Sequence, residues 1–466
     1  MNAEEIRKAV QDQREYFASG RTLDVKFRKE MLVWLKIAVQ THQKEIEEAL
    51  RLDLGRHDAE AYFCDIGTII LEVNEMIKGL SRWNRPEIHY SGIHCFPSVI
   101  TKVYKMPYGV TLIISPFNFP FLLALGPLAA AIAGGNTAVL KASSKSVRST
   151  ALLKKMMQET FPAEYVTVID GGHETADLCL AQRFDKIFYT GSPAVGKHVL
   201  HAAADHLTPC ALELGGETGN WCIVRKDADL KDAARKIAFF KALNSGQICI
   251  DINQCAVAEE IAEEFLKELE AAFAAKLGAD CLHSDEYPKL ITPAAYEKCA
   301  AEAEAYMERV VYGGRGDRSE QKFEPTVIYP VGIDEEIVKH ELFSPLLPIV
   351  PFKDDEIDAL LKTISEREHG LAFYLFTKDV RWAERTMQRM QFGGGGINEV
   401  CLHMMVKGVP FNGTGHSGMG AYHGIWGFRE FTHPCTVLFG SSIGVMPLRE
   451  HPYKPWKKKM IRLFER

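Results

Sequence analysis

The strongest constraint on the fold is that residues 110–140 include no charged side chain. A run of this length can cross a bilayer as one apolar helix. Pro116, Pro120, Pro127 and the Gly134-Gly135 pair interrupt the run, however, and such residues break a continuous helix. We therefore expect a strand, a loop, a helix and a second strand, all buried in a parallel sheet, and no transmembrane segment.

The segments that follow alternate between strand and helix patterns, which is typical of a parallel sheet covered by helices on both faces. In the first series we expect strands at 110–115, 137–140, 165–169, 186–189 and 211–214, with helices at 122–133, 147–159, 174–181 and 194–204. In the second series we expect helices at 230–243, 262–275, 356–364 and 380–390, with strands at 255–258, 326–328, 347–351 and 372–376. The glycine-rich runs 393–396 and 410–420 are expected to be irregular.

Three further regions flank these series. Apolar residues recur at helical spacing from residue 4 to about residue 83, which predicts a helical layer. Alternation within residues 89–104 indicates an extended excursion, either a hairpin at a subunit interface or a plain connector. The tail 452–466 has the pattern of a basic amphipathic helix, for which docking on the protein itself or on a partner subunit is favoured over a membrane surface.

Composition narrows the class of protein. A chain of 466 residues is too long for one hydrophobic core, so two or three domains are expected. A net charge of -6 argues against nucleic acid as a partner. The eleven cysteines are scattered without a C-x-x-C pair, which indicates reduced thiols in the cytoplasm and neither disulfides nor a metal site.

Cys249 has the most suggestive neighbours. It ends the polar, turn-forming segment Asn244-Ser245-Gly246-Gln247-Ile248-Cys249, which follows an apolar helical run. A thiolate is a strong nucleophile, but a single cysteine is more often a small buried hydrophobe. Its role therefore depends on other motifs.

A second candidate site lies between a predicted strand and helix. The G-x-G-x-x-G fingerprint is absent there, but Gly191, Ser192, Pro193 and Gly196 form a turn that opens the helix. Ser192 is a suitable N-cap, and the free amide groups of such a turn bind a pyrophosphate. A purely structural turn is an equally good interpretation.

Three motifs together resemble those of the NAD(P)-dependent aldehyde dehydrogenase superfamily, over essentially the whole chain. They are Ser115-Pro116-Phe117-Asn118-Phe119-Pro120, Leu212-Glu213-Leu214-Gly215-Gly216 and the segment that ends at Cys249. Pro410-Phe411-Asn412-Gly413 and the run 418–424 look most like the class 3 branch. That branch handles medium-chain, fatty and aromatic aldehydes and commonly forms homodimers.

The resemblance implies an aldehyde dehydrogenase-like α/β fold with two doubly wound parallel-sheet domains and a small β excursion for oligomerisation. Residues 1–87 and 105–215 would form the NAD(P)-binding domain, and residues 216–418 the catalytic domain. Residues 88–104 and 435–450 would supply oligomerisation strands, and residues 451–466 a C-terminal amphipathic tail.

The same resemblance assigns catalytic roles. Cys249 would attack the aldehyde as nucleophile, and Asn118 would stabilise the oxyanion of the thiohemiacetal. After reduction of NAD(P), water activated by Glu213 would hydrolyse the thioester to a carboxylic acid. A structural carboxylate is the alternative for Glu213, and an Asx turn is the alternative for Asn118.

Cofactor contacts are implied in the same way. Lys141 would contact the adenosine ribose, and Gly191, Ser192 and Gly196 would form the phosphate turn. Glu341 and Phe343 would hold the nicotinamide ribose. A surface salt bridge is the alternative for Lys141 and Glu341.

Several positions depart from the family pattern. Ser144 stands where many NAD-preferring relatives have a glutamate, so that NADP is a plausible alternative to NAD, helped by Lys141 and Lys145. Glu217 replaces a common lysine, and Ser344 a common glycine. Asp251 either biases the site toward polar or cationic aldehydes or points away from it.

Three rival functions stay open at this stage. A CoA-acylating aldehyde dehydrogenase would share Cys249, although retention of Glu213 favours hydrolysis. A non-catalytic binding protein would keep only the fold. A cysteine hydrolase is less favoured, because no histidine lies in a recognisable partnering motif.

Overall fold

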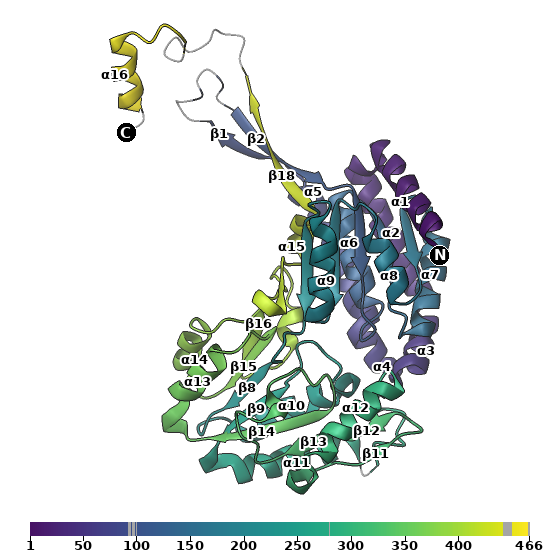
Figure 1. Ribbon diagram of the computed structural model, residues 1–466, viewed down its shortest axis with the longest axis vertical. Coiled ribbons are helices and arrows are strands. Elements are labelled where there is room, and N and C mark those ends of the chain that lie inside the picture. The colour runs from purple at the N-terminus through teal and green to yellow at the C-terminus, as the bar shows by residue number, and fades with distance from the viewer. Residues whose placement is uncertain (92–94, 96–97, 99, 279, 441–449, 465–466) are drawn as a thin grey trace.

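The computed structural model describes residues 1–91, 95, 98, 100–278, 280–440 and 450–464. Two α/β lobes lie one above the other, and a narrow arm projects from the upper lobe (Figure 1). Each lobe contains a mainly parallel sheet with helices on both faces. The predicted α/β class with two parallel sheets is confirmed.

The first lobe contains a six-stranded sheet in the order β17-β7-β6-β3-β4-β5, parallel except for β17. Its strands are β3 (Val110–Ile114), β4 (Thr137–Lys141), β5 (Val166–Ile169), β6 (Lys186–Gly191), β7 (Cys210–Leu214) and β17 (Gly418–Met419). Its helices are α1 (Ala3–Ala18), α2 (Val25–Thr41), α3 (Gln43–Leu54), α4 (Asp58–Ala61), α5 (Gly67–Trp83), α6 (Leu122–Gly134), α7 (Val147–Thr160), α8 (His173–Leu180), α9 (Pro193–Ala204) and α15 (Gly424–Glu430).

The uncharged run forms β3, a loop, α6 and β4, as expected. Successive side chains of a strand point to opposite faces, and in β3 both faces are buried. Leu112 packs toward the cluster that includes Ile6 of α1, whereas Ile113 packs toward the cluster that includes Leu125 of α6. Burial on both faces explains why this segment carries no charge. Within the described residues, no helix is long and apolar enough to cross a membrane.

The second lobe contains a seven-stranded sheet in the order β10-β13-β14-β9-β8-β15-β16, in which only β10 is antiparallel. Its strands are β8 (Trp221–Val224), β9 (Gln254–Ala258), β10 (Val310–Tyr312), β13 (Thr326–Ile328), β14 (Leu346–Phe352), β15 (Ala372–Phe376) and β16 (Gly394–Ile397), beside the small pair β11 (Gly316–Asp317) and β12 (Lys322–Phe323). Its helices are α10 (Leu230–Ala242), α11 (Ala262–Leu277), α12 (Pro293–Glu304), α13 (Ile357–Ser365) and α14 (Val380–Met387).

One prediction for this lobe was wrong, and four short strands and one α-helix were missed. The run at 393–396 is largely an edge strand, β16, and not irregular backbone. Glycine is required there because a Cβ on Gly395 would lie 2.1 Å from the carbonyl oxygen of Phe373. The elements that were not predicted are β8, β10, β11, β12 and α12. Each of these strands has only two to four residues, and α12 is rich in alanine and glutamate.

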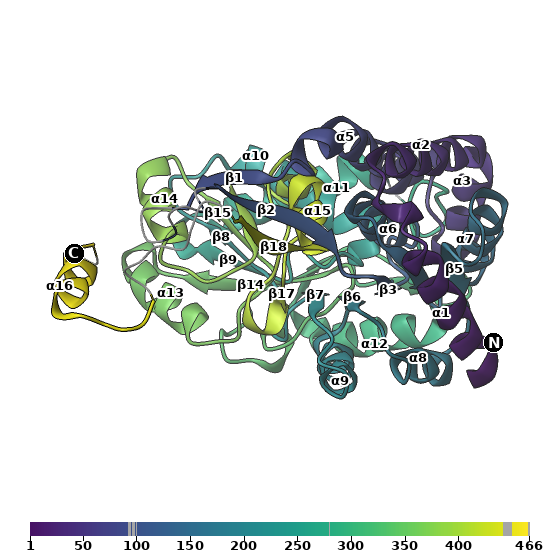
Figure 2. The same cartoon turned by 90° about the horizontal axis from the view of Figure 1, so that it is seen from above.

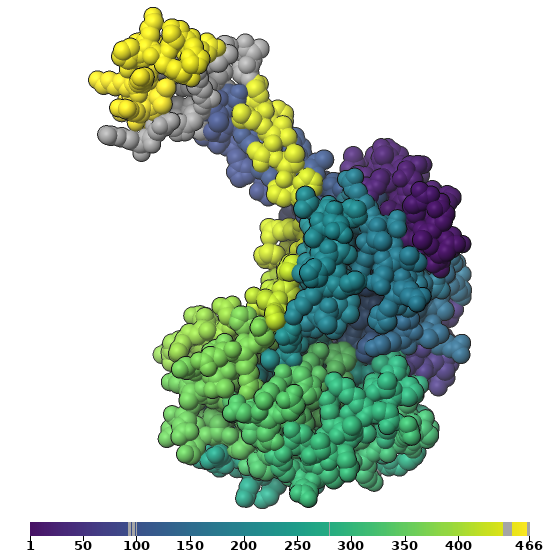
Figure 3. Space-filling model, in the orientation of Figure 1, coloured from purple at the N-terminus to yellow at the C-terminus, as the bar shows by residue number. Residues whose placement is uncertain are grey.

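The arm consists of antiparallel strands β1 (Glu87–Tyr90), β2 (Ile100–Pro107) and β18 (Thr432–Phe439), with β2 in the middle. The expected extended excursion therefore forms two paired strands, β1 and β2. The third strand, β18, comes from near the C-terminus and pairs with β2. Figures 1 and 2 show α16 (Pro455–Phe464) beyond the arm, and in Figure 3 it lies apart from both lobes. Parts of the predicted oligomerisation segments, at 92–94, 96–97, 99 and 441–449, lie outside the described residues, as do 465 and 466 of the tail.

Candidate active site

A pocket of about 460 Å³ lies between the two lobes. Its walls combine the carboxyl ends of β3, β6 and β7 with the turn before Cys249 and the loop around Glu341. Seven of the ten predicted site residues line it: Asn118, Gly191, Ser192, Glu213, Cys249, Glu341 and Phe343. The fold thus brings residues from five separate motifs to one cavity.

The other three predicted residues do not line this pocket. Gly196 lies within α9, where a Cβ would approach Leu214 Cδ2 to 2.9 Å, so that glycine permits close helix–strand packing. Lys141 ends β4, and its ammonium group donates to the carbonyl oxygens of Ala142, at 2.8 Å, and Gly171, at 2.7 Å. Lys141 therefore bonds to backbone carbonyl groups, and not to a carboxylate in the surface salt bridge that was its alternative interpretation. Ser144 is exposed just beyond the strand.

The turn before Cys249 is held by polar groups on several sides. Gln247 donates through Nε2 to the carbonyl oxygens of Asn244 and Lys289, both at 3.0 Å, and accepts from the amide of Ile291. Asn220 donates to the carbonyl oxygens of Cys249 and Asp251, each at 2.8 Å. These bonds fix the backbone on both sides of the thiol.

The Cys249 thiol lies in an environment that disfavours its charged form. Burial, Glu341 and Glu213 raise its pKa to about 12, while the backbone amides of Cys249 and Ile250 act in the opposite direction. Both amides therefore point toward the sulfur, where they can also stabilise a negative oxygen bound next to it.

Two carboxyl groups with buried oxygens face the same pocket. Glu213 lies on β7, and neither of its carboxyl oxygens has a hydrogen-bond partner among the described residues. Burial raises the pKa of Glu213 well above its ordinary value. Burial also raises the pKa of Glu341 to about 8. Glu341 packs against Gly215, where a Cβ would lie 2.1 Å from Oε1, so that this carboxyl requires glycine beneath it.

Asn118 lies in the loop between β3 and α6 and is 3% exposed. Its side-chain Nδ2 donates to the carbonyl oxygen of Gln247 at 3.1 Å. A primary amide has two N–H donors, so the second is available to a ligand. Phe117, its neighbour, meets Phe343 edge-on across the pocket, with ring centroids 5.9 Å apart.

The first turn of α9 fits the phosphates of a dinucleotide. Ser192 is the N-cap and Pro193 the first helical residue, as predicted. No side chain caps this helix among the described residues, so its first amides are free for an anion. Together with the unpartnered oxygen of Glu341 and the volume of the pocket, this arrangement suits a nicotinamide dinucleotide.

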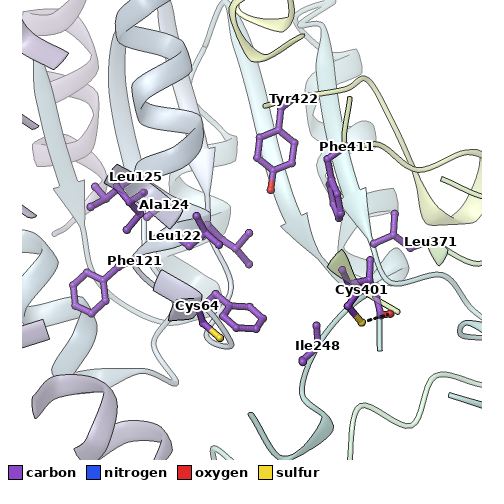
Figure 4. Packing of buried hydrophobic residues seen from close by; sticks show 14 of the residues in the cluster. Cys64, Phe121, Leu122, Ala124, Leu125, Ile248, Leu371, Cys401, Phe411 and Tyr422 are labelled. Carbon is purple, nitrogen blue, oxygen red and sulfur yellow. Dashed lines mark hydrogen bonds between the residues drawn. The ribbon is translucent and has the colours of Figure 1, made fainter. Parts of the chain in front are cut away.

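A second pocket, narrow and almost wholly apolar, has a free volume of about 40 Å³. It is lined by Phe63, Cys64, Thr68, Phe119, Leu122, Phe240, Leu243, Ile248, Ile250, Cys401, Leu402, Met404 and Met405. Ile248 and Ile250, the sequence neighbours of Cys249, line this second pocket, whereas Cys249 lines the larger one. Figure 4 shows Cys64 and Leu122 on one side and Ile248 and Cys401 on the other.

The open question about Asp251 is settled by its position. Its side chain is buried, lines neither pocket, and accepts from Lys241 Nζ at 2.8 Å. Lys241 also donates to the carbonyl oxygen of Ile252. Asp251 therefore points away from the site, and the interpretation that it selects polar or cationic aldehydes is wrong.

The other unusual positions have local partners. Glu217 accepts from Lys197 at 2.9 Å and lies 3.0 Å from His416. Ser344 lines the larger pocket. Arg56 is fully buried against the turn before Cys249. No sequence motif predicts this position, because the only local pattern at Arg56 is a spacing of four residues to Glu60.

Comparison with known proteins places this site in a family. The profile of the aldehyde dehydrogenase family matches residues 1–437. A Staphylococcus aureus protein, 4,4'-diaponeurosporen-aldehyde dehydrogenase, is 35% identical over 98% of this chain and 99% of its own. A dog protein, "aldehyde dehydrogenase, dimeric NADP-preferring", is 33% identical over 98% and 99% of the two chains.

Among solved structures, the substrate-bound state of Staphylococcus aureus AldH superposes with a TM-score of 0.95 at 34% identity and covers 100% of both chains. Other relatives include class 3 proteins such as aldehyde dehydrogenase family 3 member H1 of Arabidopsis thaliana, 32% identical over 98% of this chain and 94% of its own. The chain therefore belongs to the aldehyde dehydrogenase family, close to its class 3 members, and is an NAD(P)-dependent enzyme that oxidises aldehydes.

Proposed function

We propose that Cys249 is the nucleophile, Asn118 the oxyanion donor and Glu213 the general base. The observation that carries this assignment is that these three residues, from three separate motifs, line one pocket. Cys249 shares the pocket with two carboxyl groups, Glu213 and Glu341, that have oxygens without hydrogen-bond partners. Among the described residues, one other cysteine lines this pocket, Cys299, which is buried on α12.

In this proposal the Cys249 thiolate, the form that the last step regenerates, adds to the aldehyde carbon, and the carbonyl oxygen becomes an oxyanion. The second N–H of the Asn118 amide and the backbone amides at Cys249 and Ile250 stabilise that charge. When bound, the nicotinamide cofactor accepts a hydride from the substrate carbon. The substrate is then held on Cys249 as a thioester.

Glu213 completes the reaction by removing a proton from water, whose oxygen attacks the thioester carbon. The carbon–sulfur bond breaks, and the carboxylic acid and the Cys249 thiolate separate. Because both Glu213 oxygens lack protein partners, the carboxyl is free to take this proton. This favours hydrolysis over transfer of the acyl group to CoA.

The proposed substrates are apolar aldehydes, medium-chain, fatty or aromatic. The support is the apolar pocket beside Cys249, whose walls lack charged side chains among the lining residues. Its small free volume suits a slim chain, and Met404 and Met405 can adapt to larger groups because methionine side chains are flexible. The Staphylococcus relative is likewise named for an aldehyde.

We further propose that NADP is accepted and preferred. Ser144 carries no charge that repels a 2′-phosphate, and Lys145 lines the cofactor pocket close by. The dog relative is named NADP-preferring, which supports the same choice.

We also propose a cytoplasmic homodimer. The eleven cysteines are free thiols, in keeping with a reducing compartment. The arm exposes apolar side chains, with Ile88 69% and Tyr90 75% exposed, and such surfaces mark interfaces. The dog relative is named dimeric.

The central test is an absorbance assay for NADH and NADPH formation over a panel of aldehydes. Cys249→Ser should lower turnover by at least about 1,000-fold, whereas Cys435→Ser, on the arm, should leave it unchanged. Glu213→Gln should slow release of the acid. Absence of turnover with every aldehyde, or wild-type activity in Cys249→Ser, contradicts the proposal. Formation of an acyl-CoA when CoA is added identifies the enzyme as the rival CoA-acylating aldehyde dehydrogenase.

A pH-dependent prediction follows from the charges around the thiol. Above its pKa of about 8, Glu341 is ionised and opposes the Cys249 thiolate. Glu341→Gln should therefore lower the pKa of Cys249 and speed its alkylation by iodoacetamide at about pH 9, with little change at about pH 6, where Glu341 is neutral. The rate is followed by mass spectrometry of the Cys249 peptide, with the exposed Glu366→Gln as control. If Glu341→Gln is alkylated more slowly than the wild type at about pH 9, this prediction is wrong.

Cofactor choice is tested at Ser144. Ser144→Glu places a carboxylate where it repels a 2′-phosphate, so the ratio of kcat/KM for NADP to that for NAD should fall at least about tenfold. Ser19→Glu, an exposed position on another helix end, controls for the added charge. A wild-type enzyme with clearly higher kcat/KM for NAD shows the preference to be wrong.

The dimer is tested by sedimentation of the full chain. The wild type should sediment with the mass of two chains, and Ile88→Asp should shift it toward one chain, because a charge in an apolar interface is costly. Leu207→Asp, at a residue 90% exposed on the first lobe, is the matched control. A single-chain mass for the wild type rules out the dimer.

A further inference from the structure

The turn that presents Cys249 has an unfavourable backbone. Asn244, Ser245 and Gly246 lie consecutively in the left-handed region, with φ of 49°, 54° and 71°. Glycine tolerates this conformation, but asparagine and serine adopt it at a cost. Such a turn persists only where the surrounding structure holds it in place.

Arg56 of the first lobe reaches this turn across the lobe boundary. It lies between α3 and α4, and its side chain is fully buried. Its Nε donates to Asn244 Oδ1 at 3.0 Å, and its Nη2 donates to the backbone carbonyl of Asn118. One guanidinium group therefore binds both the turn before the nucleophile and the proposed oxyanion residue.

The two loops are also bonded to each other. Asn244 Nδ2 donates to the carbonyl oxygens of Asn118, at 3.1 Å, and Gln247, at 3.0 Å. The Asn118 amide donates to the same Gln247 oxygen at 3.1 Å. Arg56 thus completes a closed set of hydrogen bonds that fixes the spacing between Asn118 and Cys249.

Two carboxyl groups hold Arg56 in this position. Asp65 accepts from Arg56 Nη1 at 2.6 Å and, through its other oxygen, from the amides of Phe121 and Leu122 at the start of α6. Glu60 lies 3.4 Å from Arg56 Nε and accepts from the amide of Asn244 at 2.9 Å. Burial raises the pKa of Glu60 to about 7, although the Arg56 charge lowers it.

We propose that Arg56 and Glu60 are positioning residues that hold the left-handed turn and thereby align the Cys249 sulfur with the Asn118 amide. Arg56 acts on the side chain of Asn244 and the backbone of Asn118, and Glu60 acts on the backbone of Asn244. Neither residue lines the cofactor pocket or the apolar pocket. This inference rests on the roles proposed above for Cys249 and Asn118.

A buried ion pair can also serve stability alone, so the test needs a matched arginine. Arg28 is such a residue, since it is equally buried in the first lobe. It donates to the carbonyl oxygens of Thr22 and Ala133 and to Asn84 Oδ1, and it contacts no residue of the site through these bonds.

The first experiment compares Arg56→Lys with Arg28→Lys in the full chain. Both variants should lower the thermal midpoint. Only Arg56→Lys should lower kcat, on the order of 100-fold, because misplacing a reacting group by about 1 Å has an effect of that size. The KM for the cofactor should stay within about twofold, and amide hydrogen exchange of the peptide 244–250 should accelerate. Equal kcat values in the two variants overturn the proposal.

A second comparison applies even if Arg56→Lys does not fold. Glu60→Gln keeps an oxygen that can accept from the Asn244 amide, whereas Glu60→Ala removes it. The glutamine variant should retain most of the wild-type kcat, and the alanine variant should lose it together with protection of the 244–250 peptide. Equal losses in both variants contradict the inference. If Cys249→Ser abolishes turnover and the Arg56 and Glu60 variants do not, only this inference fails, whereas an active Cys249→Ser enzyme refutes the proposed function.

Discussion

Parallel strands all end at the same edge of their sheet, and the candidate site depends on that constraint. In the first lobe β3, β6 and β7 deliver Asn118, the turn at Gly191 and Ser192, and Glu213 to one edge. The second lobe presents Cys249 and Glu341 opposite them. Because both edges face one cavity, side chains that are far apart in sequence meet there.

Burial then sets the electrostatics of the cavity. The thiol and both carboxyl groups lie where their charged forms are disfavoured, and each has a raised pKa. Burial therefore opposes the ionisation of all three groups, which lie close together. Two lysines near the cavity are bonded to other groups, Lys241 to Asp251 and Lys141 to backbone carbonyls, whereas Lys145 and Lys298 line the cavity itself.

Much of the fold was predictable, because the periodicity of apolar residues and the positions of glycine and proline residues that break helices are local properties of the sequence. The segment from β3 to β4 is an example. Strand β8 was missed because four apolar residues carry little periodicity, and β16 because glycine usually signals irregular backbone. At the site, the motifs identified the pocket-lining residues, but the pairing of Asp251 with Lys241 and the position of Arg56 depend on tertiary contacts that no local pattern encodes.

The pairing of β17 with β7 has a mechanical consequence. Gly418, which follows the second lobe in sequence, pairs with Glu213, while Thr190 pairs with Glu213 on the other side. The strand that carries Glu213 is thus paired on both sides, and it is not a free edge that another chain can extend. Both neighbours, β6 and β17, belong to the sheet of the first lobe, so the backbone that carries Glu213 is fixed within that lobe alone.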